Sequence, residues 1–338
     1  MGRTKEGVYA NEWSAPGYTV DAAGKVVDGY RPGEPSNWGR WGDDDRRGTA
    51  NLITPEKVAA AAGLVKTGKV FSLALPIDAS VPTYPGRSAP NHYFKHSGAD
   101  VVTGNPLQAT RPDAVIASDD GIDMNLQGST QWDGLGHCQY RDTRYNGFWS
   151  GNVTAYGGDT SLGIENMRES FVGRGVLLDF PRFAGVENLE PGTSINTRML
   201  EEICAKQGVT VGAGDIVLIR TGHLRLWDPT AEQAAKWEYF LNSPGVGASG
   251  ISWFADNDIA ATASDTASFE VSPYENDDAL AVHRAFLIDL GLTIGELWDL
   301  EALAEACAED GSYEFLLVAP PLYIPAAVGS PLNPIAIK

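Results

Sequence analysis

The sequence predicts one α/β domain. Short apolar runs at 175–180 and 215–222 are bounded by turn residues, as buried strands are, and a helical pattern at 196–208 separates them. Strands that alternate with helices are typical of a single α/β domain. After residue 50 no charge run or Pro/Ser stretch divides the chain, and 338 residues can bury one large core.

The chain begins with a segment of a different character. Residues 1–50 are rich in Gly, Pro, Trp and charge and show little periodicity, which predicts an irregular arm that belongs to the same domain or contacts another subunit. Residues 51–338 are then the main domain. It opens with a helix that Thr54 can cap, with Pro55 in the first turn and a glycine stop.

The later elements follow from the same patterns. Beyond the opening helix we predict strands at 70–77, 175–180, 215–222, 259–264 and 313–320. We predict helices at 196–208, 230–241, 277–291 and 297–311, with Thr230 as the cap of the second of these.

Composition excludes several classes of protein. Asp plus Glu is 44 against 25 Lys plus Arg, a formal charge of −19, so nucleic acid and membrane surfaces are poor partners. The three cysteines include no close pair, which argues against a disulfide framework and a cysteine zinc site. The first residues lack an apolar signal region and no run reaches the length of a membrane helix. We therefore expect a cytoplasmic protein.

The most informative segment is Gln127-Gly-Ser-Thr-Gln131-Trp-Asp133-Gly-Leu-Gly-His137. Side chains alternate along a strand, so Gln127, Gln131 and Asp133 are expected on one face, with Trp132 in the core on the other. The glycines at 134 and 136 allow a bend that returns His137 toward them. Amide oxygens, a carboxylate and an imidazole that converge in this way can bind a divalent cation.

This spacing resembles the signature His-x-Gly-Thr-His-x-Asp-x-Pro-x-His of the cyclase family of metal-dependent hydrolases. Asp133 and His137 match it, whereas Gln127 and Gln131 stand where the family usually has its first two histidines. Leu135 replaces the proline. The family also has a later histidine and glutamate, for which this chain offers the pair His283 and Glu296.

The resemblance extends over nearly the whole chain. Residues 38–56 and 321–337 are similar to the long-chain branch of the family. The resemblance implies a swivelling β/β/α domain, with residues 51–338 as the cyclase-like catalytic domain. It also implies subunit contacts around the site, so we expect a homodimer or homotetramer, with the Trp-bearing arm packed on a neighbour.

The resemblance further implies one divalent ion, Zn or Mn, per site. Its expected ligands are Asp133, His137, His283 and Glu296, with Gln131 as a possible oxygen ligand. Because both early histidines are absent, a second ion is not expected. His283 or Glu296 could serve as the general base.

Other residues are weaker candidates. Gln127 is expected next to the ligands rather than on the metal. His92 and His96 are four residues apart in a predicted loop, and either could line the substrate pocket. Phe148 and Trp149 are candidates for a pocket wall, or for ordinary core.

Three functions remain open at this stage. The first is a metal-dependent hydrolase of a small amide, lactone or ester, because family members open formamides, isatin-type lactams and dienelactones. The second is a metal-free binding or scaffold protein on the same fold, which the two glutamines suggest. The third is a metal-dependent lyase or cyclase. A serine hydrolase is disfavoured because no Gly-x-Ser-x-Gly motif occurs.

Overall fold

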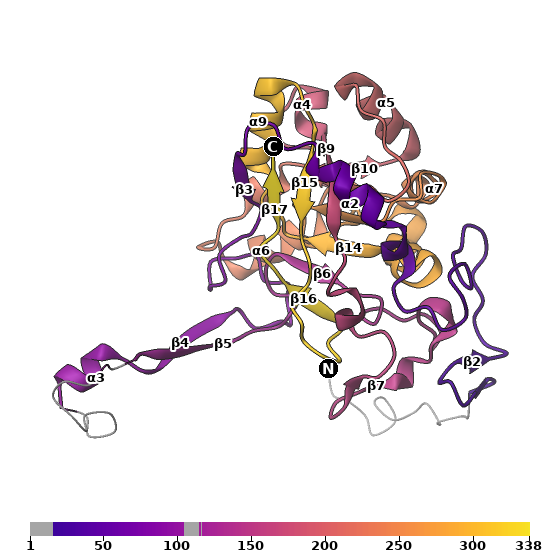
Figure 1. Cartoon of the computed structure of the whole chain (residues 1–338), viewed down its shortest axis with the longest axis horizontal. Coiled ribbons are helices and arrows are strands. Elements are labelled where there is room, and N and C mark those ends of the chain that lie inside the picture. The colour runs from indigo at the N-terminus through magenta and orange to yellow at the C-terminus, as the bar shows by residue number, and fades with distance from the viewer. Residues whose placement is uncertain (1–15, 105–114, 116) are drawn as a thin grey trace.

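One mixed sheet organises the molecule. The computed structural model describes residues 16–104, 115 and 117–338. Within these residues, nine strands form the main sheet in the order β16-β6-β14-β13-β11-β9-β15-β17-β3. Helices pack around it in a single α/β body (Figure 1), which confirms the predicted fold class.

The centre of the sheet consists of four parallel strands whose carboxyl ends lie at one edge. They are β9 (Val172–Asp179), β11 (Ile216–Arg220), β13 (Ala261–Ser264) and β14 (Thr293–Glu296). Their side chains are almost all buried, as expected for parallel strands covered on both faces. The carboxyl edge of such a sheet is where ligand sites usually form.

Antiparallel strands complete the sheet on both sides. Next to β9 lie β15 (Glu314–Val318), β17 (Ile335–Ile337) and β3 (Val70–Ser72). Next to β14 lie β6 (Gln131–Asp133) and β16 (Gly329–Pro331). Two strand predictions were too long: β3 ends at Ser72, and only the last three residues of the 127–133 segment are strand.

The described residues contain the helices predicted after Thr54 and at 196–208 and 230–241, and three short α-helices that were not predicted. Helix α2 (Pro55–Ala62) begins as predicted, with the Thr54 hydroxyl accepting the Lys57 N–H at 3.4 Å. It contacts β9 and β15. The other α-helices of four or more residues are α3 (Gly98–Val102), α4 (Phe180–Ala184), α5 (Thr197–Gln207), α6 (Gln233–Leu241), α7 (Ile251–Asp256) and α9 (Glu301–Asp310).

The largest departure from the sequence prediction lies between residues 277 and 311. The predicted helix over 277–291 consists of the short α8 (Ala281–His283) followed by a π-helix, η8 (Arg284–Leu290). Strand β14 follows, where no strand was predicted, so α9 begins at Glu301 rather than at 297. Pairing with both β13 and β6 stabilises this strand, and contacts between such distant segments are not visible in local sequence patterns. Thr230 also does not cap α6, because Glu232 occupies that position.

The N-terminal segment packs on the same body. It contains β1 (Thr19–Val20), β2 (Val26–Val27) and the 3-10 helix η1 (Gly48–Leu52). The Trp38 indole N–H donates to the Ile288 carbonyl at 2.7 Å, and Asn37 donates to Leu290 at 2.9 Å. These bonds hold the arm against the π-helix that leads into β14.

The shorter elements connect these layers. The small strands are β7 (Val153–Thr154), β8 (Gly158–Asp159), β10 (Ser194–Ile195) and β12 (Gly245–Val246). The 3-10 turns are η2 (Tyr145–Gly147), η3 (Ser150–Asn152), η4 (Ile164–Met167), η5 (His223–Leu226), η6 (Ala248–Gly250) and η7 (Glu275–Asp277).

A hairpin of β4 (Asn91–His96) and β5 (Asp119–Asp123) projects from the body, with α3 beyond it (Figure 1). Residues 92–96 were expected to be a loop and are strand instead. Phe94 is 58% exposed and Ile122 is 51% exposed. Ile122 pairs with His92, two residues from Phe94, so both apolar side chains lie on one face of the hairpin.

The core beneath the motif segment is aromatic. Trp132 is fully buried, and its ring centroid lies 4.9 Å from that of Phe171 and 4.8 Å from that of Trp298. Its indole N–H donates to the Ala319 carbonyl at 2.7 Å. The predicted core position of Trp132 is therefore confirmed, and its neighbours Gln131 and Asp133 must face the other way.

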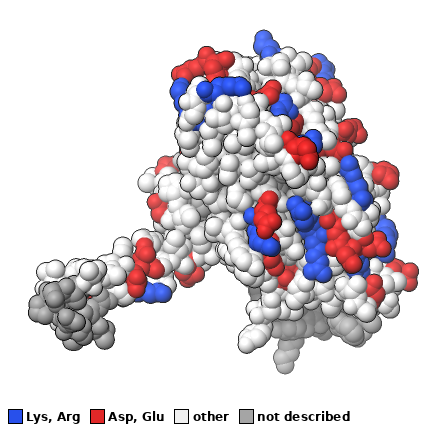
Figure 2. Space-filling view, viewed as in Figure 1, with Lys and Arg blue, Asp and Glu red and all other residues white. Residues whose placement is uncertain are grey.

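The surface carries charges of both signs. Figure 2 shows basic and acidic side chains intermingled over the visible face of the body. In the part of the chain that the structure describes, no helix has the length and apolar character needed to cross a membrane.

We predict that the projecting hairpin is held by a second copy of the chain. An isolated two-stranded hairpin is only marginally stable in water, so its apolar face should need another surface. Light scattering should show a homodimer or larger oligomer for the wild type. Phe94→Ser combined with Ile122→Ser should shift it toward monomer, whereas Tyr156→Ser, at an exposed site on β7–β8, should not. A monomeric wild type at micromolar concentration would contradict the prediction.

Candidate metal centre

The pairing of β6 with β14 brings three polar side chains to one face. Gln131 lies opposite Glu296 and Asp133 lies opposite Ile294 in this antiparallel pair. Directly opposite residues share a face, and so do residues two apart on one strand. Gln131, Asp133 and Glu296 therefore point the same way, although Gln131 and Glu296 are 165 residues apart in the chain.

His283 joins this cluster from α8. Its Nε2 lies 3.5 Å from a carboxylate oxygen of Glu296, and its Nδ1 lies 2.9 Å from Glu270. Glu270 also accepts the backbone N–H groups of Val282 (3.0 Å) and His283 (3.3 Å). The Glu270 carboxylate thus fixes the end of the helix and favours a proton on Nδ1, which directs Nε2 toward Glu296.

The potential ligand atoms of Asp133, His283 and Glu296 all lie within 4.8 Å of one another, and all three residues are buried. The Gln131 amide nitrogen donates to Glu296 at 2.7 Å and lies 3.5 Å from Asp133. The amide oxygen of Gln131 is buried without a hydrogen-bond partner. Two carboxylates and an imidazole are thus gathered at one point, with the Gln131 amide beside them.

Burial of so much negative charge shifts the titration of the cluster. Burial raises the pKa of the Glu296 carboxyl, and the nearby charge of Asp133 raises it further. Burial also raises the pKa of the Cys138 thiol, which follows His137 in the sequence. For His283 burial opposes protonation, but the bonds to Glu270 and Glu296 outweigh it and raise the pKa to about 10. The cluster therefore favours bound positive charge.

The donor set fits a divalent ion. Carboxylate oxygens and an imidazole nitrogen are common ligands of Zn²⁺ and Mn²⁺, and the unsatisfied oxygen of Gln131 is a further donor available to a cation. An ion would also offset the repulsion between the Asp133 and Glu296 carboxylates. The residues that could hold it are Asp133, His283 and Glu296, with Gln131 beside them.

His137 lies next to this group rather than inside it. Its Nε2 is 3.8 Å from Asp133, and its side chain remains 23% exposed. A side chain at Gly136 would meet Leu162 and the carboxylate of Asp159, so the bend before His137 requires glycine. Asp159 is held by the buried Arg144 at 2.6 Å, and this pair anchors the loop that carries His137.

Gln127 does not lie on the strand with Gln131, as the alternation argument expected. Its backbone carbonyl accepts a hydrogen bond from the Arg87 guanidinium at 2.7 Å. Its own amide nitrogen is buried without a partner. A turn at 126–130 breaks the alternation before β6 begins, which is why the face of Gln127 could not be read from spacing.

The structure places three other predicted site residues away from the cluster. His92 is exposed on the hairpin and lies 2.7 Å from Asp120. Phe148 is buried under Lys25 and Arg46 of the N-terminal arm, and the Trp149 indole N–H donates to the Tyr18 hydroxyl at 3.2 Å. Phe148 and Trp149 therefore pack the arm on the body, which agrees with the core alternative rather than with a pocket wall.

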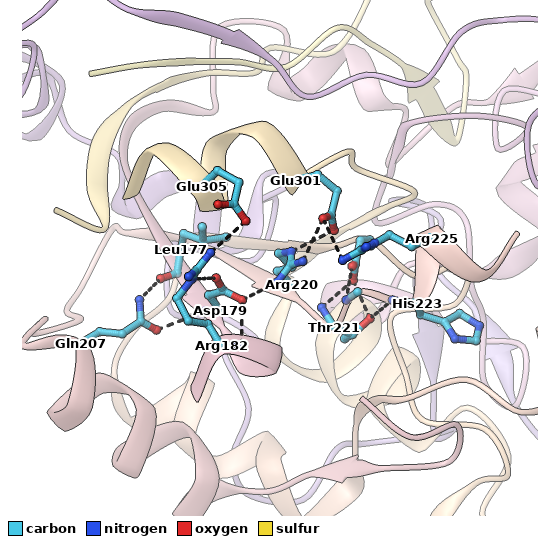
Figure 3. A network of polar contacts seen from close by, with 12 residues as sticks. Leu177, Asp179, Arg182, Gln207, Arg220, Thr221, His223, Arg225, Glu301 and Glu305 are labelled. Atoms are coloured by element: carbon cyan, nitrogen blue, oxygen red, sulfur yellow. Dashed lines mark hydrogen bonds and ion pairs between the residues drawn. The ribbon is translucent and has the colours of Figure 1, made fainter. Parts of the chain in front are cut away.

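A second polar network lies along the same edge of the sheet and is structural. Figure 3 shows Arg220 between Asp179 and Glu301, with bonds of 2.7 and 2.9 Å. His223 forms no hydrogen bond with a carboxylate of this network. Its Nε2 contacts the Tyr239 carbonyl at 3.0 Å instead. Arg220 has its charge fully paired, so this network ties β9 and β11 to α9 rather than offering a binding site.

Sequence reasoning missed Glu270, Arg87 and the cavity beside His283. This cavity, of about 160 Å³, is lined by Cys138, Tyr140, Leu280, His283 and Arg284 among others. Glu270 lies a few residues after the carboxyl end of β13. Because ligand sites often form at the carboxyl ends of parallel strands, this position could have marked Glu270 as a candidate. Arg87 belongs to no recognisable motif.

The sheet order and the buried cluster at its edge define an α/β protein with a candidate metal centre. The chain belongs to the cyclase family: the family model described as a putative cyclase matches residues 71–271. A crystal structure described as a novel cyclase has 47% sequence identity and a TM-score of 0.84, covering 90% of this chain and 99% of that chain. The predicted family is thus confirmed.

More distant structures share the fold. Isatin hydrolase A from Labrenzia aggregata, bound to benzyl benzoate, has 16% identity and a TM-score of 0.56, over 82% of this chain and 94% of that one. Isatin hydrolase A from Ralstonia solanacearum has 17% identity and a TM-score of 0.57, covering 84% of this chain and 98% of that one. The comparison with curated proteins gave no match.

We predict that Glu270→Gln weakens metal binding without unfolding the protein. The amide cannot accept all three N–H groups that Glu270 accepts, so the His283 ring loses its orientation. Loss of such a partner typically lowers metal affinity about 10- to 100-fold. Titration with Zn²⁺ or Mn²⁺ measures this. Glu275→Gln is the matched control, since Glu275 bonds Ser249 and Ser194 instead; equal affinity in both variants would contradict the role of Glu270.

Proposed function

We propose that this protein is a metal-dependent hydrolase of a small amide, lactone or ester. The observation that carries the proposal is the buried group of Asp133, His283 and Glu296, whose potential ligand atoms lie within 4.8 Å of one another. Membership of the cyclase family and the hydrolases among its structural neighbours support an enzyme.

One divalent ion, Zn or Mn, is proposed for this group. When bound, such an ion supplies Lewis acidity, which polarises a carbonyl group and makes water more acidic. Asp133 and Glu296 contribute negative charge, and Glu270 holds the His283 ring in place through Nδ1. Burial of the three side chains keeps competing solvent away from them.

His137 is the best placed residue to move protons. Its ring is partly exposed and lies 3.8 Å from Asp133, whereas His283 and Glu296 are buried in contact with each other. In the proposed reaction His137 takes a proton from the water that attacks the carbonyl carbon. The C–N or C–O bond then breaks, and the proton passes to the leaving nitrogen or oxygen. The products are a carboxylic acid and an amine or alcohol.

One observation favours the alternative of a metal-free binding protein. The Gln131 amide nitrogen lies between Glu296 and Asp133, at 2.7 and 3.5 Å, where its partial positive charge reduces the repulsion between the two carboxylates. A site in which this amide replaces the cation would keep the fold and lose the hydrolysis.

We predict that Asp133→Asn loses metal and hydrolytic activity together while remaining folded. The substitution preserves shape but removes a charge that offsets the ion. Elemental analysis of protein purified without chelator should find about one divalent ion per wild-type chain, and the variant should lose at least about 100-fold in affinity, beyond the usual effect of a residue next to a ligand. Activity is measured on a panel of small formamides, lactones and esters.

Asp256→Asn provides the control, because Asp256 is exposed on α7. It should keep both metal and activity. A wild type that takes up no stoichiometric ion, even after incubation with Zn²⁺ or Mn²⁺, would refute the hydrolase proposal and favour the metal-free alternative.

A further inference from the structure

Arg87 lies at the edge of the candidate metal centre. It ends a tight turn in which its N–H donates to the Tyr84 carbonyl at 3.0 Å, with Gly86 at a φ of 96°. Its guanidinium donates through Nη1 to the Gln127 carbonyl at 2.7 Å. That bond holds the positively charged guanidinium beside the segment that continues into Gln131 and Asp133.

The charge of Arg87 has no acidic partner among the described residues, although the protein is rich in carboxylates. The buried Arg144 and Arg220, by contrast, each contact carboxylates at 2.9 Å or less. The Nη1 bond to Gln127 leaves the Nε–Nη2 edge of the Arg87 guanidinium available. This edge presents two parallel N–H donors, the geometry that binds a carboxylate in bidentate fashion.

Gln127 in turn lies beside the cluster. A side chain at Gly329, the residue of β16 that pairs with Asp133, would meet the Gln127 amide. The bond from Arg87 to Gln127 therefore places the guanidinium next to the cluster. An anionic substrate would otherwise be repelled there by the carboxylates of Asp133, Glu296 and Glu270.

The guanidinium lies over the ring of the half-buried Tyr84, 5.7 Å from its centroid. The Tyr84 ring packs on the buried Phe240, with the two centroids 5.2 Å apart, and this contact holds it beside the guanidinium. A planar molecule with a negative group matches a guanidinium that adjoins an aromatic ring.

We propose that Arg87 binds a carboxylate on the substrate, so that the enzyme acts on amides or lactones that carry an anionic group beside the scissile bond. This inference rests on the proposed hydrolase function. Arg87 then determines specificity: it holds the substrate by its charge and takes no part in proton transfer.

A matched pair of substrates tests the proposal. 2-Formamidobenzoate and formanilide share the scissile formamide and differ in the carboxylate. The wild type should hydrolyse 2-formamidobenzoate with the higher kcat/KM. Arg87→Gln should lower kcat/KM for this substrate about 10- to 100-fold, mainly through KM, the size expected for loss of a hydrogen bond to a charged group. Formanilide should be affected less than about threefold, and Arg87→Lys should retain part of the activity.

A binding measurement separates this inference from the proposed function. Calorimetry with benzoate should show binding to the wild type that weakens about 10-fold or more in Arg87→Gln. Metal content should not change. Arg46→Gln, at an exposed arginine over Phe148, is the control and should behave as the wild type in every assay.

The outcomes are distinct. Benzoate binding that depends on Arg87, without hydrolysis of any substrate, would support the anion site and refute the hydrolase. Equal benzoate affinity in the wild type and Arg87→Gln would overturn the inference. So would an equal loss of kcat/KM for formanilide and 2-formamidobenzoate, because Arg87 would then support the site without recognising the carboxylate.

Discussion

The antiparallel pairing of β6 with β14 is the constraint on which the candidate site depends. It sets Gln131 opposite Glu296 and leaves Asp133 on the same face, while Trp132 enters the aromatic core on the other. A shift of one residue in this register would turn Asp133 into the core and Trp132 toward the cluster. The buried contacts of Trp132 with Phe171 and Trp298 therefore stabilise the register, and the register defines the site.

The site also illustrates how buried charge is tolerated in this fold. Asp133, Glu270 and Glu296 lie close together in the interior, where isolated carboxylates would be costly. Hydrogen bonds from backbone N–H groups, from His283 and from the Gln131 amide offset part of that cost. The negative charge that these bonds do not offset favours a bound cation. This preference connects the electrostatics of the cluster with the metal-dependent chemistry proposed for it.

The sequence predicted the central strands β9, β11 and β13 because parallel strands read as continuous apolar runs. It failed at β14, which is stabilised by pairing with distant segments, and at Gln127, which a turn removes from the strand face. Of the site, Asp133, His283 and Glu296 were predicted through the family resemblance, and the structure brings these three together. Phe148 and Trp149 pack against the N-terminal arm, which is the core alternative to a pocket wall, and His92 lies on the hairpin. Local patterns do not reveal these neighbours.

By itself, then, the sequence determined the α/β class, the family and the residue types available for a metal. Those properties are carried by local apolar periodicity and by motif spacing, which need no knowledge of distant contacts. Tertiary structure alone decided that Glu270 supports His283, that His137 lies beside the cluster rather than within it, and that Arg87 adjoins it. Each of these depends on side chains that are far apart in the chain and meet only when the sheet edge and its loops have packed. Local sequence patterns carry no information about such contacts, because packing sets the relative positions of distant segments.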